Sequence, residues 1–560
     1  MKRTMTAAEA IVRCLEIEEV SQAFCVPGES YLPIMDALYE HSDIRLIATR
    51  HESGAAFMAE GYAKTSGKPA VVMATRGVGA ANLSIGVHTA KQDSTPMIVF
   101  LGQVHSKFRG REGFQEVDLD RFFAPIAKWA VEIQDPERIP ELVQRAFRIA
   151  TTGRPGPVVI AFPEDVLTAE ITVDFAPAVR PYPNAPNQEA IDAAISLLEQ
   201  AERPLILAGG GVKQAGGEEA LLALSEAFAM PVVAAFRRHD VFPNDHQNYV
   251  GHAGLGPASA IIETMRSADV IVAIGTRLSE VTTQDYSIPG DGQKLIHIDI
   301  DSEVVGKTWQ PAVGMVADAK LALESLQTQG ITRIVRKPWK KWKAERRAAY
   351  QIASDPGNGD TADHPAGCNM RAVVRAMSEL LPPDTIIAND AGNFAGWLHA
   401  FYQFREKKTY VGPTSGAMGY GYPAALGAKL AAPERLVVSL SGDGGFMMTM
   451  QELETAARCR IPVIALVFNN AMYGTIRMHQ EKHYPGRVVA TDLGAVDFAA
   501  VAKALNIESY HVDSTADFRA TLARIVQTPV SEPVLIEVKV DPNVISVGAT
   551  IESIRKTVLK

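Results

Sequence analysis

Residues 435–470 read RLVVSLSGDGGFMMTMQELETAARCRIPVIALVFNN. Two apolar runs of strand length enclose a segment with helical spacing, which predicts a strand–helix–strand unit. A Gly-Asp-Gly-Gly follows the first run, and an Asn-Asn pair closes the second. In a right-handed unit with parallel strands, both strands end at the same sheet edge, where open α/β sheets bind ligands. We therefore expect Asp443 and Asn470 to lie close together.

The residue types at this edge indicate what binds there. The oxygens of Asp443 and Asn470 are hard donors, which suit Mg²⁺ and leave room for phosphate oxygens and water. The glycines at 442, 444 and 445 permit a tight turn and a close approach of the backbone to a diphosphate near a helix N-terminus. The chain has no GxxxxGK[ST], so a P-loop is excluded. A bare GDG also marks ordinary turns, but GDGG and NN after neighbouring strands predict a metal-bridged diphosphate.

The rest of the chain alternates apolar runs of strand length with helical patterns, which is typical of parallel α/β domains. We predict an α/β protein of three doubly wound parallel-sheet domains. Four prolines in residues 175–187 indicate an extended linker. The predicted bounds are 1–175, 188–330 and 366–545 for the domains, 331–365 for a second linker and 546–560 for a tail.

Composition narrows the class of protein. A chain of 560 residues is too long for one core, and 47% hydrophobic with 21% charged residues is typical of a soluble globular protein. The net charge of −9 argues against a nucleic-acid surface. We expect no membrane span, because no apolar run approaches the roughly 18 residues needed. The N-terminus resembles a helix rather than a signal peptide, and four scattered cysteines without CxxC spacing indicate reduced thiols in the cytoplasm.

The GDGG–NN pairing resembles the signature of thiamine diphosphate enzymes, in which the Asp and the second Asn ligate the metal. The whole chain is similar to the acetolactate synthase and pyruvate oxidase group of that family. The matching stretches are VPGES (26–30), RHESGAAFMAEGYAKTSGKP (50–69), GFQEVD (113–118), GRPGPVVIAFPEDV (153–166) and SGAMGYGYPAALGAK (415–429). The resemblance implies a pyrimidine-binding, a middle and a pyrophosphate-binding domain, in this order. It also implies thiamine diphosphate and Mg²⁺ as cofactors.

The resemblance implies a role for each matching residue. Glu52 faces N1′ of the aminopyrimidine and favours the tautomer whose 4′-nitrogen takes the proton from C2, through pKa matching and proximity. Met418 is the apolar wedge that bends the cofactor, and the carbonyl of Gly416 receives its 4′-amino group. Gln115, next to Phe114, faces the substrate. The implied metal ligands are Asp443, Asn470 and the carbonyl of Met472, and further cofactor contacts come from Gly392, Asn393, Gly444, Gly445, Tyr473 and Gly474.

Missing histidines favour one reaction over another. The His-His pair of pyruvate decarboxylases is not found, and Thr75 stands where benzoylformate decarboxylase has a histidine. A site poor in proton donors lets an acyl carbanion attack a second carbonyl, although His88, His105 and His479 are unplaced. We predict that a 2-oxo acid, pyruvate first of all, is decarboxylated and its acyl group joined to a carbonyl acceptor. The alternatives are a decarboxylase that releases an aldehyde, an FAD-dependent pyruvate oxidase and a non-catalytic paralogue.

Some positions depart from the family pattern and leave the substrate open. His479 stands near the position of a Trp that selects the acceptor in biosynthetic synthases. GREGFQE replaces the usual GTDAFQE, which brings Arg111 and Glu112 to the substrate side. FAD is left open as well: residues 275–286 and 296–301 resemble flavin-binding segments, but residues 251–256 match only loosely, and Gln214 breaks a GxGxxG pattern.

The resemblance also implies an assembly. In the family, the pyrimidine half of the cofactor is bound by one subunit and its diphosphate half by the partner. We therefore predict a homodimer or homotetramer with active sites shared between chains.

Overall fold

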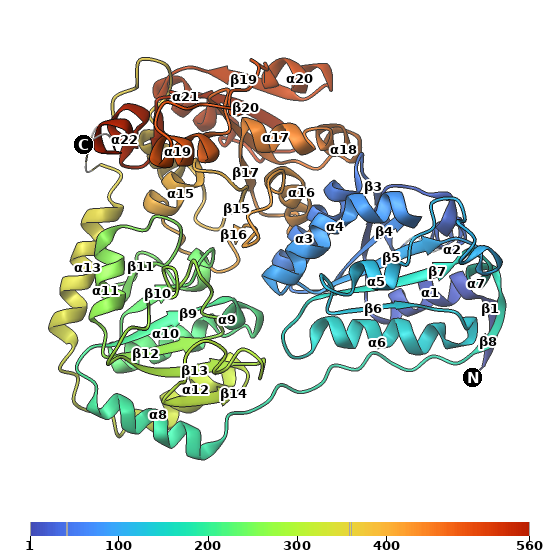
Figure 1. The fold of residues 1–560 in the computed structure, drawn as a ribbon, viewed down its shortest axis with the longest axis horizontal. Helices are drawn as coiled ribbons and strands as arrows, with labels where there is room; N and C mark the ends of the chain where they lie inside the picture. Colours follow the sequence, from blue (N-terminus) through green and yellow to red (C-terminus); the bar gives the residue numbers. More distant parts are fainter. Residues whose placement is uncertain (1, 41–42, 358, 360, 559–560) are drawn as a thin grey trace.

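The computed structural model describes residues 2–40, 43–357, 359 and 361–558, and Figure 1 shows three lobes built around parallel sheets. Each lobe has one six-stranded sheet whose neighbouring strands all run parallel. Helices cover the sheets on both faces, which is the doubly wound arrangement. The predicted α/β class with three parallel-sheet domains is confirmed, whereas the exact domain bounds stay predictions.

In each sheet the strand order reverses beside the first strand of the unit, and in the N-terminal and C-terminal sheets the last two strands are inverted as well. The N-terminal order is β3 (Arg45–Ala48), β2 (Gln22–Cys25), β4 (Ala70–Thr75), β5 (Met97–Gln103), β7 (Pro157–Pro163), β6 (Trp129–Glu132). The middle order is β11 (Tyr249–His252), β10 (Val232–Ala234), β9 (Pro204–Ala208), β12 (Val270–Ile274), β13 (Lys294–Asp299), β14 (Val313–Val316). The C-terminal order is β16 (Tyr410–Val411), β15 (Ile386–Asn389), β17 (Val437–Gly442), β18 (Ile464–Asn469), β20 (Val534–Lys539), β19 (Glu508–Val512). The switch points, β2/β4, β9/β12 and β15/β17, are where such sheets bind ligands.

The helices follow the strands in alternation. The N-terminal lobe has α1 (Ala7–Ile17), α2 (Leu32–Tyr39), α3 (Glu52–Ser66), α4 (Arg76–Asp93), α5 (Leu119–Phe123), α6 (Ile139–Thr151) and α7 (Glu164–Thr168). The middle lobe has α8 (Gln188–Gln200), α9 (Gly210–Gln214), α10 (Glu218–Phe228), α11 (Ser259–Ser267) and α12 (Ala319–Gly330), and α13 (Lys340–Ser354) follows them. The C-terminal lobe has α14 (Met370–Leu380), α15 (Ala395–Phe401), α16 (Gly421–Ala431), α17 (Asp443–Thr449), α18 (Glu452–Cys459), α19 (Gly474–His483), α20 (Phe498–Ala504), α21 (Thr515–Ile525) and α22 (Ile551–Val558).

Short strand pairs and two connections complete the fold. Two antiparallel pairs, β1 (Arg3–Thr6) with β8 (Glu170–Val173) and β21 (Val544–Ser546) with β22 (Ala549–Thr550), lie outside the large sheets. Residues 174–187 contain no helix or strand and run from β8 to α8 along the bottom of Figure 1. The helix α13, in the predicted second linker, packs on the middle lobe, where Trp339 just before it donates to the carbonyl of Phe228 at 3.1 Å. None of the described helices is both long and apolar enough to cross a bilayer.

The N-terminal and C-terminal lobes share one hydrophobic core, centred on the contact between α3 and α16. Glycines let these two helices approach at backbone distance. A Cβ added to Gly61 would lie 2.1 Å from the carbonyl oxygen of Ala424, and one added to Gly427 would lie 1.9 Å from that of Met58. Any side chain at either position would therefore push the helices, and with them the two sheets, apart.

Candidate active site

Asp443 and Asn470 meet at the carboxyl edge of the C-terminal sheet, next to its switch point. Gly442 of β17 pairs with Phe468 of β18, so the residues after both strands turn toward each other. The N–H of Asn470 donates to Oδ2 of Asp443 at 3.3 Å, and the N–H of Gly444 donates to Oδ1 at 2.8 Å. The structure brings together the acid and the amide that the sequence predicted to be neighbours.

The Asp443 carboxyl is buried, with 6% of the residue exposed. Burial raises its pKa, while main-chain N–H groups, first that of Gly444 and then those of residues 470–472, lower it in part. Its place in the first turn of α17 favours a negative charge. A buried carboxylate needs further compensating charge, and a divalent cation supplies it.

The atoms around this turn that could ligate a metal ion are all oxygens. Asp443 offers a carboxylate, Asn470 a side-chain amide and Met472 a main-chain carbonyl. Within the described residues, no group of three His, Cys, Asp or Glu side chains is arranged to hold a metal. A set of one carboxylate, one amide and one carbonyl falls outside that pattern and fits Mg²⁺, which retains several waters and binds substrate phosphates.

Glycines form a tightly packed cradle around the same turn. A Cβ on Gly444 would lie 2.6 Å from the ring of Tyr473, and one on Gly474 would lie 2.9 Å from the side-chain amide of Asn393. Side chains at these positions would clash, and their absence lets the backbone approach a diphosphate closely. The structure thus places four predicted cofactor residues, Gly444, Tyr473, Gly474 and Asn393, at one sheet edge.

The loops after β15 and β16 complete this edge. Gly392 has a φ of +156°, and the amide of Asn393 donates to the carbonyl of Ile545 at 2.6 Å, which ties the C-terminal segment to the loop. Gly416 has a φ of +70° and open space around it. Met418 is half-buried and lies in the turn before α16. Thr449 of α17 holds this turn in place, because its hydroxyl donates to the carbonyl of Gly419 at 2.7 Å.

Asp390 is a residue of this edge that the sequence analysis missed. It follows β15 and is fully buried, and burial raises its pKa to about 6. Its Oδ1 accepts from the N–H of Ala391 at 2.7 Å and from that of Tyr420 at 3.3 Å. A Cβ on Gly445 would lie 3.0 Å from its Oδ2. Asp390 therefore packs the turn of Met418 against the diphosphate cradle, and the signal was an Asp directly after a predicted strand.

Glu52 occupies the corresponding edge of the N-terminal lobe. It is the first residue of α3 and is 9% exposed. The amide of Asn82 on α4 donates to its Oε2 at 2.9 Å, and a Cβ on Gly79 would lie 3.1 Å from its Oε1. The first two turns of α4 thus fix the direction of the carboxyl at the start of α3. Asn82 was also missed, and helical spacing alone does not show that it reaches Glu52.

The loop that carries Gln115 is held by a charged residue of its own. The carboxylate of Glu116 accepts from the N–H groups of Gly110 at 2.7 Å and Gly113 at 2.9 Å, and from Arg109 at 2.8 Å. These N–H groups, followed by Arg109, lower the pKa of Glu116. Gln115 has a φ of +64°, in the left-handed region that costs energy for a residue with a Cβ.

The loop is docked on α4, because the carbonyl of Gln115 accepts from the N–H of Gly77 at 3.0 Å. The two departures from the family pattern, Arg111 and Glu112, lie on the same loop, and Glu112 also has a positive φ of 56°. Of the unplaced histidines, His479 lies on α19, where its ring stacks on His483 with centroids 6.2 Å apart. Thr75, at the end of β4, bonds to the hydroxyl of Ser30 at 2.6 Å.

Comparison with known proteins agrees with this architecture. Residues 5–122, 191–326 and 390–538 match the N-terminal TPP binding domain, the central domain and the C-terminal TPP binding domain of thiamine pyrophosphate enzymes. The chain belongs to this family. It is 37% identical over 553 residues to a probable acetolactate synthase large subunit of Methanocaldococcus jannaschii, which covers 96% of this chain and 92% of that protein.

Bacterial relatives give the same result. The chain is 33% identical to the acetolactate synthase isozyme 1 large subunit of Escherichia coli, over 96% of this chain and 95% of that one. It is 34% identical to the acetolactate synthase large subunit of Corynebacterium glutamicum, over 87% and 79%. This protein is therefore a thiamine diphosphate-dependent enzyme similar to acetolactate synthases.

Among the described residues of one chain, Glu52 makes no bond to the Asp443–Asn470 turn, although the N–H groups of Arg50 and His51 beside it donate to Glu452 of the C-terminal lobe. Glu52 lies at the edge of the N-terminal sheet, and the turn of Asp443 and Asn470 at the edge of the C-terminal sheet. Among the described residues, no hydrogen bond or ion pair connects Glu52 to Asp443, Asn470 or Met472. Glu52 itself interacts with its own lobe, through Asn82.

The middle lobe has a cavity of about 280 Å³ at its own switch point, between the ends of β9 and β12. Gly210, Gly211 and Gly275 line one side, and the half-buried Arg277 and the buried Asp299 line another. Burial lowers the pKa of Arg277 to about 10. The segments that resemble flavin-binding ones line this cavity. However, the chain lacks the last glycine of a GxGxxG pattern, which argues against a dinucleotide as the ligand.

Proposed function

We propose that this chain is a thiamine diphosphate- and Mg²⁺-dependent carboligase of the acetolactate synthase type. It removes CO₂ from a 2-oxo acid, with pyruvate as the first candidate, and joins the remaining acyl group to a second carbonyl. The observation that carries the proposal is the buried Asp443–Asn470 turn with its glycine cradle, in a chain whose relatives are named acetolactate synthases. When bound, thiamine diphosphate supplies the electron sink that decarboxylation of a 2-oxo acid needs.

In this proposal the residues of the C-terminal lobe bind the cofactor and its metal ion. Asp443, Asn470 and the carbonyl of Met472 would hold Mg²⁺, which would supply the charge that neutralises the diphosphate. Gly444, Gly445, Tyr473 and Gly474 line the diphosphate, with Gly392 and Asn393 on the other side of the switch point. The carbonyl of Gly416 receives the 4′-amino group, and Met418 fixes the bend between the two rings.

In this proposal the residues of the N-terminal lobe move a proton and orient the substrate. Glu52 holds a proton at N1′, which favours the tautomer able to accept the C2 proton. Asn82 positions the carboxyl of Glu52 from α4 at 2.9 Å. Gln115 donates a hydrogen bond to the carbonyl or carboxylate of the substrate, and the docked backbone of its loop keeps that amide in place.

We further propose a homodimer or homotetramer in which Glu52 of one chain faces Asp443 of another. An isologous pair creates two equivalent sites and explains why each half-site, taken alone, leaves apolar side chains such as Met447 and Met448 about half exposed. The cytoplasm is the proposed location, where free cysteines stay reduced.

Two alternative activities are tested in the same experiment. Protein supplied with pyruvate, thiamine diphosphate and Mg²⁺ should release CO₂ and form acetolactate. Acetaldehyde as the sole product would replace the carboligase with a simple decarboxylase. Peroxide formation that depends on added FAD would indicate an oxidase, and the flavin absorbance of the purified protein decides whether FAD is bound at all.

A further inference from the structure

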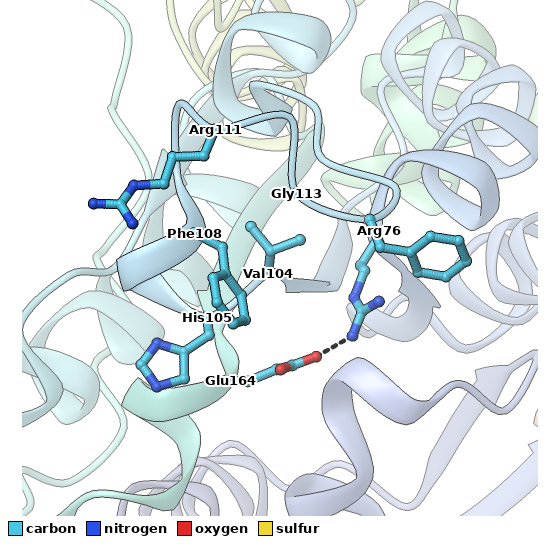
Figure 2. Close-up of a pocket in the computed structure, with 8 residues that line it drawn as sticks. Arg76, Val104, His105, Phe108, Arg111, Gly113 and Glu164 are labelled. Atoms are coloured by element: carbon cyan, nitrogen blue, oxygen red, sulfur yellow. Dashed lines mark hydrogen bonds and ion pairs between the residues drawn. The ribbon is translucent and has the colours of Figure 1, made fainter.

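A cavity of about 370 Å³ opens beside the N-terminal half-site (Figure 2). It lies between the first residue of α4, Arg76, and residues 104–114, the segment that leads to Gln115. Its volume falls within the range of about 300–1,000 Å³ that is typical of small-molecule sites. The methyl group of pyruvate would leave most of this space empty.

The cavity borders the residues of the proposed reaction. Gly79, one helical turn after Arg76, lies against the carboxyl of Glu52, and Gly77 holds the backbone of Gln115. One wall of the cavity is thus the same helical turn that contacts both predicted catalytic residues. A substrate whose carbonyl reaches Gln115 has this space beside it for a side chain.

Two of the basic side chains that line the cavity, Arg76 and His105, are already paired with carboxylates. The Arg76 guanidinium, with 9% of the side chain exposed, binds Glu29 at 2.9 Å and also Glu164, the pair drawn with a dashed line in Figure 2. His105 lies 3.3 Å from Asp165. Figure 2 shows Arg111 directed away from the Arg76–Glu164 pair, and this side chain is exposed.

The remaining surface of the cavity is apolar. Val104 is buried, Figure 2 shows the ring of Phe108 between Val104 and His105, and the ring of Phe114 lies 5.9 Å from the Arg76 guanidinium. A carboxylate would gain little from Arg76, because it would have to displace Glu164 or Glu29 from it and leave a buried charge behind.

From these contacts we infer that the cavity holds the side chain of an uncharged acceptor, an aldehyde with a branched aliphatic or aromatic group. The inference rests on the proposed carboligase function and names its acceptor class. In the reaction, the bond between the acyl carbon and the carboxylate of pyruvate breaks and CO₂ leaves. The acyl carbon bonds to the aldehyde carbon, and one proton from solvent ends on the aldehyde oxygen. The product is an α-hydroxy ketone, and no oxidant or reductant is needed.

The test compares two acceptors with the same isobutyl group, one an uncharged aldehyde and the other an anionic 2-oxo acid. The enzyme, loaded with thiamine diphosphate and Mg²⁺, receives pyruvate with isovaleraldehyde, or with the 2-oxo acid that carries the same isobutyl group. We expect the mixed product to form at least about tenfold faster from the aldehyde. Equal rates, or a preference for the 2-oxo acid, would overturn the inference. Absence of CO₂ release from pyruvate alone would overturn the proposed function first.

A variant that fills the cavity tests the location. A Cβ on Gly113 would lie 3.4 Å from Cβ of Phe108 and 3.5 Å from Cγ1 of Val104, which are ordinary contacts, so Gly113→Val adds volume without a clash at Cβ. The ratio of mixed product to acetolactate should fall at least about tenfold. The control is Gly290→Val in the middle lobe, where the nearest atom lies 3.6 Å away, and it should leave the ratio unchanged.

A second variant covers the case in which Gly113→Val misfolds. Phe108 is 45% exposed, so Phe108→Ala should fold and enlarge the cavity. In this variant, the ratio of mixed product to acetolactate should rise for naphthaldehyde, a bulkier aldehyde, relative to the ratio for isovaleraldehyde. A ratio that neither variant changes would show that the acceptor binds elsewhere.

Discussion

The N-terminal and C-terminal switch points have the same topology but are built differently. The C-terminal edge is made of backbone: three glycine positions, a carboxyl that accepts main-chain N–H groups, and turns that start where strands end. The N-terminal edge is made of side chains: Glu52 held by Asn82, and Arg76 held by two glutamates. The first arrangement suits a ligand that never changes, such as a diphosphate. The second can alter its substrate by exchanging side chains.

The largest effect is expected on the N-terminal edge. Glu52→Gln should leave cofactor binding intact but slow hydrogen–deuterium exchange at C2 of thiamine diphosphate by ~10²–10⁴-fold, the usual contribution of a positioned acid or base. Glu60→Gln is the control, since Glu60 lies buried on the same helix but bonds to Thr95 at 2.7 Å rather than to the site. It should lower stability and leave exchange fast. Fast exchange in Glu52→Gln would show that our assignment is wrong.

On the C-terminal edge, Asp443→Ala should act on binding rather than on the proton. Loss of a charged ligand should weaken Mg²⁺ and thiamine diphosphate binding by about 10²-fold or more, since even residues behind metal ligands contribute about 10–100-fold. Titration calorimetry measures both binding affinities. The control is Asp513→Ala, which removes an exposed carboxylate just after β19 of the same sheet, and it should bind normally. Normal binding by Asp443→Ala would move the metal elsewhere.

A mixture of the two defective proteins tests whether the two edges meet between chains. Glu52→Ala and Asp443→Ala proteins are each expected to be inactive. After random subunit exchange of equal amounts, about half of the dimers are mixed, and each of these has one site with both defects and one with neither, so about a quarter of all sites should work. Measured activity after proven exchange is the readout. No recovery, or a fully active monomer in sedimentation, would contradict the shared site.

The difference between the edges also explains what could be predicted from the sequence. Asp443 and Asn470 follow consecutive strands, so strand pairing alone brings them together, and GDGG and NN are visible as a pattern. The Arg76–Glu164 pair joins the first residues of two different helices, α4 and α7, and its geometry depends on side-chain directions that no period encodes. The helical spacing after Asp443 was also predicted as one stretch, whereas the structure ends α17 at Thr449 and starts α18 at Glu452.

The contact that joins the two lobes should be sensitive to a single methyl group. Gly427→Ala places a Cβ where the carbonyl of Met58 lies 1.9 Å away, and overpacking of this kind should cost about 3 kcal/mol of unfolding free energy. Denaturant unfolding measures it. In the control Gly396→Ala, the new Cβ would meet Val547 at an ordinary 3.4 Å, so stability should stay the same or rise by up to ~1 kcal/mol. Equal stabilities for the two variants would show that α3 and α16 pack less closely than described.

The smallest effect concerns how the C-terminal lobe is attached to the middle lobe. His239 and His252 of the middle lobe meet His399 of the C-terminal lobe, with ring centroids 4.3 Å from His239 to each of the other two. Burial lowers the pKa of His252 to about 4 and holds those of His239 and His399 well below 6.5, with the neighbouring histidines and Arg237 adding to the shift in the latter two. The N-terminal lobe instead contacts the middle lobe through Asp93 and Arg238, and nearby cations hold the pKa of Asp93 below its usual range despite burial. Acid should therefore loosen the C-terminal attachment first.

The sign and size of this acid effect on stability follow from the pKa shift of His252 through linkage. Its folded-state pKa is lower than its unfolded value of about 6.5, so its contribution to stability is complete above that pH and is lost as the pH falls toward 4. At pH 5 the loss should be roughly 2 kcal/mol relative to pH 7.5. Asp390, whose buried carboxyl has a raised pKa, shifts stability in the opposite direction over a similar range, so only the difference from a variant isolates the histidine. His252→Phe, which cannot be protonated, should reduce the acid destabilisation by that amount in denaturant unfolding at the two pH values. An unchanged pH dependence in His252→Phe would show that the histidine contact does not govern the acid response of this junction.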